Sequence, residues 1–169
     1  MKTIYSSSEI ANLWLRGDIN SASTRGRNFY FNGDSICSYG PHFMIARKST
    51  NKNGDTAILL TTRGYSNTTA KHIANVTDAL MYSEINVIKC AYPNENRHME
   101  NFNDWGSHLI EAVSGLSRSR KPEIYLQEIN NLRDSINSYC DFFELEIPDF
   151  LKSLISVTSK EGAKEFHKK

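Results

Sequence analysis

The chain has 169 residues, of which 39% are hydrophobic and 23% are charged, and its formal net charge is +1. This length supports one hydrophobic core, or one core with a helical appendage, without help from a metal or a disulfide. The small net charge gives no argument for nucleic-acid binding by the protein as a whole. No apolar run approaches about 18 residues, so we expect no membrane-spanning segment.

Charge is distributed unevenly along the chain. Residues 1–92 contain ten Lys or Arg against six Asp or Glu, whereas residues 93–169 contain ten against thirteen. A mildly basic half therefore precedes a mildly acidic one, and any basic surface is expected in the first half.

Cysteine spacing and the first residues bear on the cellular compartment. Cys37, Cys90 and Cys140 lie far apart and have no CxxC spacing, which favours reduced, buried thiols and a cytoplasmic location. The start, MKTIYSSSEI, contains no apolar stretch typical of a secretory signal.

In chain order, the first predicted element is a short amphipathic helix. Ser6 and Glu9 have the spacing of a capping box, in which each side chain bonds the other residue's backbone N–H. Gly17 provides a stop for this helix. The polar stretch 18–28 then predicts a loop.

The next segments predict a four-stranded antiparallel meander. Residues 28–31 and 35–39 flank Asn32-Gly33, a pair that favours a type I′ hairpin turn. A third strand is expected at 43–46, and a second Asn-Gly pair leads into a fourth at 56–62.

A helix and one more strand should complete the first half. Ser66 or Asn67 can cap a helix that runs to about Tyr82, with Ile73, Val76 and Leu80 on its apolar face. We expect this helix to cover one face of the sheet. The β-type run 85–90 should rejoin a sheet edge.

After Pro93 the apolar spacing becomes helical. A helix of about five turns is predicted from residues that repeat at three, four and seven: Met99, Phe102, Leu109, Ile110, Val113 and Leu116. Pro122 suits the first turn of a second helix, whose seam has coiled-coil spacing: Tyr125, Ile129, Leu132, Ile136, Tyr139 and Phe143. The two helices should pair antiparallel, and the 122–143 seam is either internal or a homodimer interface. A short apolar helix at 150–155 and a polar, fraying tail are expected to follow.

These elements together predict an α+β protein: an antiparallel β-meander with a covering helix, followed by an α-helical hairpin and a short C-terminal helix. We expect a β-rich subdomain at 1–92 and an α-helical subdomain at 93–169, which are either separate or parts of one compact domain.

The first candidate site is the turn 65–72. Free backbone N–H groups, small hydroxyls and the positive end of a helix dipole favour an anion there, and Lys71 and His72 should lie on the first exposed turn. Basic residues from the neighbouring strands could join them. The full candidate ligand-binding set is Arg47, Lys48, Arg63, Ser66, Thr68, Thr69, Lys71 and His72. The alternative is an ordinary capped helix start with solvated side chains.

Evidence for an enzyme is weaker. His42 and His72 are candidate catalytic histidines, which Asp34 or Asp55 could assist in a hydrolase. The common nucleotide-binding and acyl-transfer motifs are absent from the sequence, so a protein without enzymatic activity is favoured. No metal or other cofactor is expected, because the acidic helix after Pro93 offers only isolated His and Glu pairs.

Two further segments suggest partners. Basic and aromatic residues lie close together over 25–31, and the rings could stack on nucleic-acid bases if they are exposed on a sheet face. The acidic aromatic segment 141–147 would suit a protein partner if Phe142, Leu145 or Ile147 is exposed. For both segments, core packing is the alternative.

Two strings in the first half resemble a small domain family of unassigned function that is found in bacteriophage and mobile-element proteins. In that family an SY…IA hairpin precedes a helix start of the form YSxTTx[KR]H. The match lies within residues 31–80, and the matching residues are Ser38, Tyr39, Ile45, Ala46, Tyr65, Ser66, Thr68, Thr69, Lys71 and His72. The resemblance implies a phage or mobile-element origin and transfers no catalytic role.

Small proteins of such elements often bind host machinery, including defence systems. Our leading hypothesis is therefore an accessory protein without enzymatic activity that binds and inhibits a host protein in the bacterial cytoplasm. The alternative is a module that binds nucleic acid or another phosphate-bearing ligand at the basic edge around Thr68 and His72. A second alternative is a histidine-assisted hydrolase.

Overall fold

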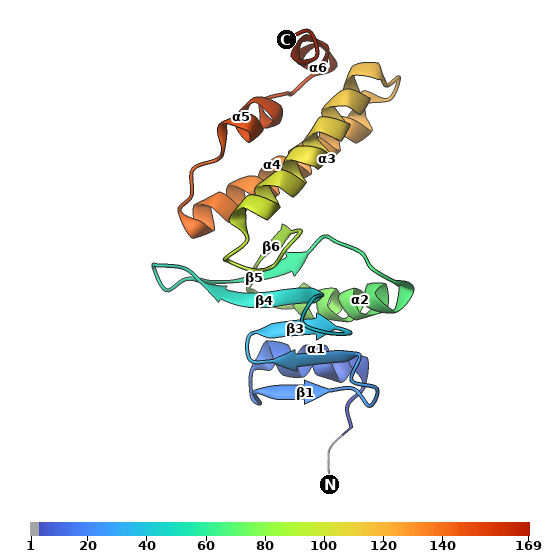
Figure 1. Ribbon diagram of the computed structural model, residues 1–169, viewed down its shortest axis with the longest axis vertical. Helices are drawn as coiled ribbons and strands as arrows, with labels where there is room; N and C mark the ends of the chain where they lie inside the picture. The colour runs from blue at the N-terminus through green and yellow to red at the C-terminus, as the bar shows by residue number, and fades with distance from the viewer. Residues whose placement is uncertain (1–3) are drawn as a thin grey trace. The chain divides into compact units, whose positions relative to one another are not determined.

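The computed structural model describes residues 4–169, and the chain divides after Arg97 into two compact units (Figure 1). The first unit contains the sheet and two helices, and the second contains four helices. The α+β class predicted from the sequence is confirmed. The division falls five residues after the predicted boundary at 92. The sequence predicted no secretory signal at the start of the chain. Residues 1–3 of that stretch lie outside the described residues.

A mixed sheet with the strand order β1-β2-β3-β4-β5-β6 organises the first unit. Its strands are β1 (Ser21–Ser23), β2 (Phe29–Asn32), β3 (Ser35–Ser38), β4 (Met44–Thr50), β5 (Thr56–Thr61) and β6 (Asn86–Cys90). Strands β2 to β5 form the predicted antiparallel meander, and β1, which lies inside the stretch predicted as loop, extends it. Strand β6 pairs with β5 in parallel, because the crossover through a helix brings the chain back in the same direction.

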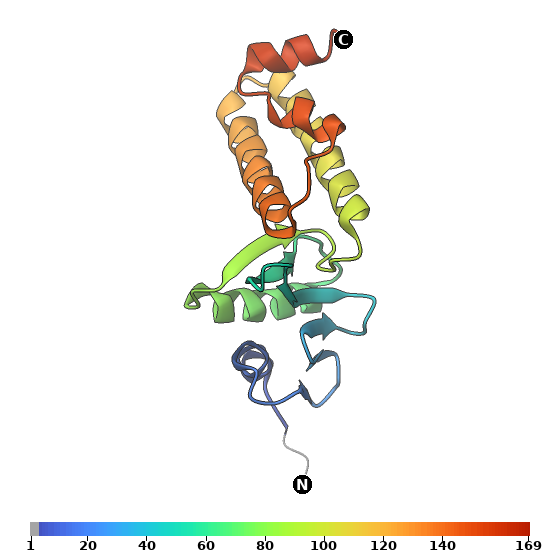
Figure 2. The ribbon, with the colours of Figure 1, turned by 90° about the vertical axis from the view of Figure 1, so that its left-hand side faces the viewer.

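Two helices, α1 (Ser7–Arg16) and α2 (Asn67–Met81), pack against each other on the same face of this sheet (Figure 2). The predicted capping box at α1 is present, and Gly17 ends the helix at φ +75°. The core between helices and sheet is made of apolar side chains from both layers, which include Ile10, Trp14, Phe29, Phe31, Ile36, Ile45, Ile58, Val76 and Leu80. Burying side chains of this size contributes about 1.5–3 kcal/mol each relative to leaving them exposed.

The β2–β3 hairpin forms as predicted, but its turn is shifted by one residue. Asn32 pairs with Ser35, so Gly33 and Asp34 are the two central residues. Gly33 has φ +59°, whereas Asn32 and Asp34 are not among the residues with positive φ. This pattern fits a type II′ turn, which needs glycine only at the first central position, and the predicted type I′ turn is wrong.

The second unit is an antiparallel pair of long helices with two short helices packed on it (Figure 1). The long helices are α3 (His98–Arg118) and α4 (Pro122–Phe143), and the short ones are α5 (Asp149–Ile155) and α6 (Lys160–Phe166). The helix α6 replaces the predicted fraying tail. It is stabilised by Ser159, whose side chain accepts the N–H of Gly162, and by Ala163, which is fully buried.

The predicted helix seams are mostly internal. Ile129, Ile136 and Tyr139 of α4 are fully buried, and the ring of Tyr139 contacts Trp105 of α3 at a centroid distance of 5.1 Å. Two members of the α3 pattern are exposed instead, Met99 at 58% and Ile110 at 54%.

The apolar side chains of segment 141–147 do not form the exposed patch that a partner would need. Phe142 is buried, and Leu145 and Ile147 are only partly exposed. Core packing, the alternative stated for this segment, therefore describes Phe142.

The packing of a tyrosine ring against a glycine and the hydrogen bonds of one arginine hold the helices of the second unit together. A Cβ built on Gly115 of α3 would lie 2.2 Å from Cε1 of Tyr125 on α4, so only glycine fits this crossing. Arg133 of α4 donates to the carbonyl oxygens of Ile155 at 2.7 Å and Val157 at 3.2 Å, where α5 ends. These bonds satisfy carbonyl groups that the end of a short helix leaves free.

The described residues contain no helix with the length and apolar character needed to cross a membrane. Cys37, Cys90 and Cys140 are all free and buried.

Candidate functional site

The end of β3 and the start of α2 are joined by a chain of hydrogen bonds. Ser66 caps α2 by accepting the backbone N–H of Thr69, and its hydroxyl donates to Oγ1 of Thr69 at 3.1 Å. Oγ1 of Thr69 lies 3.0 Å from Oγ of Ser38, which in turn lies 2.8 Å from Nδ1 of His72. We call this chain the hydroxyl relay (Ser66, Thr69, Ser38, His72). It brings together the two strings that carry the family resemblance.

His72 is buried, in contrast to the prediction of an exposed first turn. Its side chain is only 4% exposed, and its ring meets Phe29 edge-on at a centroid distance of 4.4 Å. Burial lowers the pKa of His72 below its ordinary value of 6.5, so the ring is neutral at neutral pH. Lys71 beside it is exposed, as predicted.

A row of aromatic and cationic side chains lies beside His72. The ring of Tyr39 lies 6.3 Å from that of His72 and 6.5 Å from that of Tyr65, while Tyr65 in turn lies 6.4 Å from His42. Tyr39 and Tyr65 are exposed at 47% and 67%. Such rings offer open faces and edges to a ligand.

The row continues with two arginines on one tyrosine. The guanidinium carbon of Arg63 lies 4.7 Å from the centre of the Tyr92 ring, and that of Arg97 lies 3.8 Å from it. Arg63 also lies 5.6 Å from the centre of the buried Phe43 ring. We call the whole row the aromatic–basic strip, and its members are Tyr39, His42, Arg63, Tyr65, Tyr92 and Arg97. A small pocket of about 60 Å³ lies between His42, Arg63, Tyr92 and Arg97.

A larger cavity lies beside the first turn of α2. Its volume is about 530 Å³, and its polar lining includes Arg25, Asn28, Thr68, Lys71, His72 and Asn75. We call it the α2 cavity. Its lining contains two cations and no carboxylate, so it favours an anion. Of the predicted set, Thr68, Lys71 and His72 line this cavity, and Ser66 and Thr69 belong to the hydroxyl relay.

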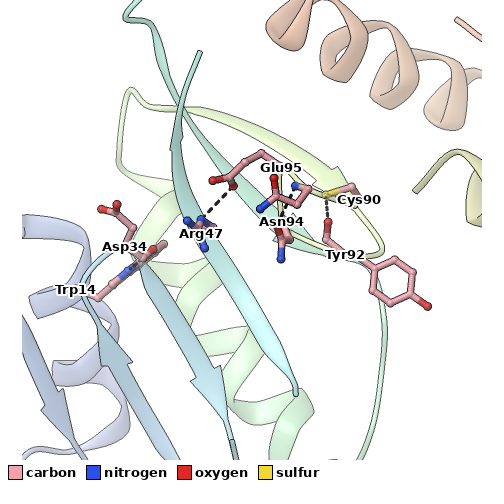
Figure 3. A network of polar contacts seen from close by, with 8 residues as sticks. Trp14, Asp34, Arg47, Cys90, Tyr92, Asn94 and Glu95 are labelled. Carbon is pink, nitrogen blue, oxygen red and sulfur yellow. Dashed lines mark hydrogen bonds and ion pairs between the residues drawn. The ribbon is translucent and has the colours of Figure 1, made fainter. Parts of the chain in front are cut away.

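Arg47 and Lys48 are engaged elsewhere, and as neighbours on one strand they point to opposite faces of the sheet. Nε of Arg47 lies 3.1 Å from Oε2 of Glu95, and Figure 3 shows the two side chains pointing toward each other. Both atoms are buried, and neither has a hydrogen bond of good geometry. Their ion pair therefore offsets the cost of removing the two charged groups from water. Nζ of Lys48 donates to the carbonyl oxygen of Trp14 in the last turn of α1. Burial lowers the pKa of Lys48.

The two candidate catalytic histidines do not form a pair. Ring contacts connect them only through Tyr65 and Tyr39, and within residues 4–169 neither forms an ion pair with a carboxylate. Ser38, the hydroxyl bonded to His72, is fully buried and thus closed to a substrate. No group of three or more metal-binding side chains occurs in the described part of the chain.

Several residues of this surface were absent from the predicted set. Tyr39, Tyr92, Arg97 and Arg25 lie on turns or at the ends of elements, where periodicity gives no information on their direction. Tyr39 belongs to the residues that match the family pattern, and Arg25 belongs to the segment 25–31 that suggested nucleic-acid binding. Nothing in the sequence connected Tyr92 and Arg97 with them.

The aromatic–basic strip and the anion-favouring α2 cavity together form the candidate ligand-binding surface. Comparison of the chain with protein-family models, with curated proteins and with solved structures finds no match.

Proposed function

We propose that the protein binds single-stranded nucleic acid along the aromatic–basic strip. The observation that carries this proposal is the pair of exposed rings, Tyr39 and Tyr65, in one row with Arg63 and Arg97. Single-strand-binding proteins combine aromatic rings that stack on bases with a groove of cations that follows the phosphates. Nucleic-acid binding was predicted as an alternative at the basic edge around Thr68 and His72, and Arg63 is the one residue that the strip shares with that predicted set.

The chemistry of each strip residue suits one part of a strand. The exposed faces of Tyr39 and Tyr65 can stack on unpaired bases, which contributes about 1–3 kcal/mol per base. Tyr92 holds Arg63 and Arg97 by cation–π contact, so both guanidinium groups are positioned before a phosphate arrives. Prior positioning lowers the entropy cost of binding.

The test measures binding of a short fluorescent single strand by anisotropy, for wild type and for Tyr65→Ala. We expect the loss of one stacking ring to weaken binding by about 1–3 kcal/mol, which is about 5- to 150-fold. Tyr82→Ala is the matched control, because Tyr82 is 90% exposed at the opposite end of α2 from the strip. Equal affinities for wild type, Tyr65→Ala and Tyr82→Ala would remove the strip as the binding site.

The second candidate is a phage or mobile-element accessory protein that docks on a host protein in the bacterial cytoplasm and inhibits it, for example in host defence. The family resemblance supports it, and so does an exposed apolar group around the end of α2, where Met81, Tyr82 and Ile85 are exposed at 65%, 90% and 38%. Exposed apolar side chains near one another are typical of protein interfaces. The free, buried thiols agree with a reducing compartment.

For strand binding Tyr82 is a control position, whereas this candidate predicts that Tyr82 is needed for binding to the host protein. If the protein docks through this group, Tyr82→Asp should abolish stoichiometric co-purification of a host protein and leave oligonucleotide binding unchanged. Unchanged co-purification with Tyr82→Asp would exclude this group as the docking surface. The hydrolase hypothesis would need His42 and His72 in one site, and the ring contacts between them run through Tyr65 and Tyr39.

A further inference from the structure

The α2 cavity contains a feature that strand binding along the strip does not use. His72 lines this cavity while its Nδ1 is bonded to the fully buried Ser38. The opposite edge of the ring, with Nε2, is therefore the part that faces the cavity. Nε2 has no hydrogen-bond or ion-pair partner among residues 4–169, although the side chain is only 4% exposed.

The hydroxyl relay determines which nitrogen of His72 carries the proton. The hydroxyl of Ser66 donates to Thr69, so the hydrogen of Thr69 is directed to Ser38. Ser38 then donates its own hydrogen to Nδ1 of His72. With Ser66 as the donor to Thr69, a hydrogen on Nδ1 would leave the hydroxyl hydrogen of Ser38 or of Thr69 without an acceptor among these bonds, which costs about 1–3 kcal/mol. Nδ1 is therefore the acceptor, and the neutral ring carries its hydrogen on Nε2.

The cavity thus presents one fixed N–H donor together with two cations. Arg25 comes from the loop before β2, Lys71 from the second turn of α2, and the side chain of Thr68 adds a hydroxyl. Neither cation forms an ion pair with a carboxylate in the described part of the chain. The carboxylate of Glu9 is already bonded to the backbone N–H of Ser6, where it caps α1.

We propose that the α2 cavity binds a phosphate monoester through Nε2–H of His72, the hydroxyl of Thr68 and the charges of Arg25 and Lys71. A monoester carries up to two negative charges and three terminal oxygens, which matches two cations and several neutral donors. This inference rests on the proposed function in one respect: if a strand lies along the strip, its terminal phosphate is the natural source of the monoester. A free mononucleotide offers the same group.

The experiment compares three probes on the full chain: a single strand with a 5′-phosphate, the same strand with a 5′-hydroxyl, and adenosine monophosphate. If a strand end occupies the cavity, we expect the 5′-phosphate to improve affinity about tenfold over the hydroxyl. If a free nucleotide occupies it, adenosine monophosphate should bind and compete with neither strand at the strip. Both outcomes require that Lys71→Ala abolishes the phosphate-dependent binding.

Two substitutions at one position separate the donor from the fold. His72→Asn keeps an acceptor near Nδ1 for Ser38 but removes the donor at Nε2, so the phosphate preference should disappear while the 5′-hydroxyl strand binds as before. His72→Gln places an amide near Nε2 and should retain part of the preference. Lys89→Ala, which removes an exposed cation on β6, is the charge control and should change nothing.

The failure of this inference and that of the proposed function are distinguishable. Equal affinity for 5′-phosphate and 5′-hydroxyl strands, with no binding of adenosine monophosphate, would overturn the phosphate site and leave strand binding intact. Binding of adenosine monophosphate that is lost in Lys71→Ala, with no affinity for either strand, would support the phosphate site and remove the proposed function.

Discussion

Tyr39 has a backbone conformation that residues other than glycine rarely adopt. Its φ of +65° lies in the left-handed region, directly after the fully buried Ser38. This conformation costs about 1–2 kcal/mol for a residue with a Cβ atom. The surrounding bonds hold it, since the N–H of Tyr39 donates to the carbonyl of Asn28 at 2.8 Å. Backbone strain at an exposed ring of the strip is consistent with a role of that ring in binding.

Tyr39→Gly tests this role. Glycine relieves the strain, so the free energy of unfolding in urea should stay within about 1 kcal/mol of wild type or rise. Strand affinity should fall about 5-fold or more, because one stacking face is lost. Tyr39→Phe keeps the ring and should bind like wild type. A Tyr39→Gly protein with full affinity would assign the ring no part in binding.

A second prediction at this scale concerns pH. The pKa of His72 is lowered in the folded state by burial, so the unfolded state binds the proton more readily than the folded state. The free energy of unfolding should therefore fall as the pH decreases below about 6.5 and stop falling below the folded pKa. Arg25 and Lys71 line the same cavity as His72, and no carboxylate does.

Urea unfolding of wild type and His72→Asn at several pH values between 8 and 5 provides the measurement. Only the pH slope is compared, because the substitution also changes packing. Wild type should lose stability relative to the variant on acidification. Parallel pH profiles would show that His72 does not titrate as a buried group.

At the residue scale, the hydroxyl relay was predictable in part. Ser66 or Asn67 was predicted as the helix cap, of which Ser66 is the cap, and the matching strings contained every relay member. The burial of His72 was missed because its polar ring suggested solvent, although His72, Val76 and Leu80 follow one another at the four-residue spacing of a single helix face. The direction of Tyr92 and Arg97 depends on a turn whose geometry no periodicity encodes.

At the scale of elements, the crossing of α3 and α4 at Gly115 leaves no room for a side chain at that position. Because a methyl group there would overlap the ring of Tyr125, Gly115→Ala should destabilise the protein by about 1–3 kcal/mol. Thermal unfolding followed by far-UV circular dichroism would detect the loss. The control is Gly64→Ala, since nothing lies within 4 Å of a Cβ built there.

The double variant Gly115→Ala/Tyr125→Ala makes this prediction specific. Removing the ring makes room for the methyl group, so the two costs should not add, which is expected for side chains in contact. Additive costs would mean that Gly115→Ala acts through something other than the Tyr125 ring.

Most elements were predictable because their ends carry local signals. The capping box at Ser6, the stop at Gly17 and the start at Pro122 depend on residues close in sequence. The strand β1 and the parallel pairing of β6 were not predictable, because both depend on partners far along the chain. The hairpin turn moved by one residue because a single glycine satisfies a type II′ turn.

At the scale of the whole molecule, local charge matters more than the net charge of +1. The strip and the α2 cavity together contain the cations Arg25, Arg63, Lys71 and Arg97. If all four meet phosphates, the logarithm of the binding constant for a single strand should fall with the logarithm of salt concentration with a slope of about −3. Anisotropy titrations at several salt concentrations measure this slope.

Single substitutions assign that slope to residues. For a strand with a 5′-phosphate, Arg63→Ala and Lys71→Ala should each reduce the magnitude of the slope by about 0.7, whereas Lys89→Ala should not. A slope near zero for wild type would contradict phosphate contact by the strip and would favour docking on a protein.

The buried thiols divide between the two units, and this gives the chain internal reporters of local opening. Cys37 and Cys90 lie in the first unit and Cys140 in the second. Burial raises the pKa of Cys37, and it raises that of Cys140 to about 11, so neither is a reactive thiolate in the closed state at neutral pH. Alkylation of each thiol therefore requires its own surroundings to open, and the labelling rates read site by site would report whether the sheet and the helices open together or independently.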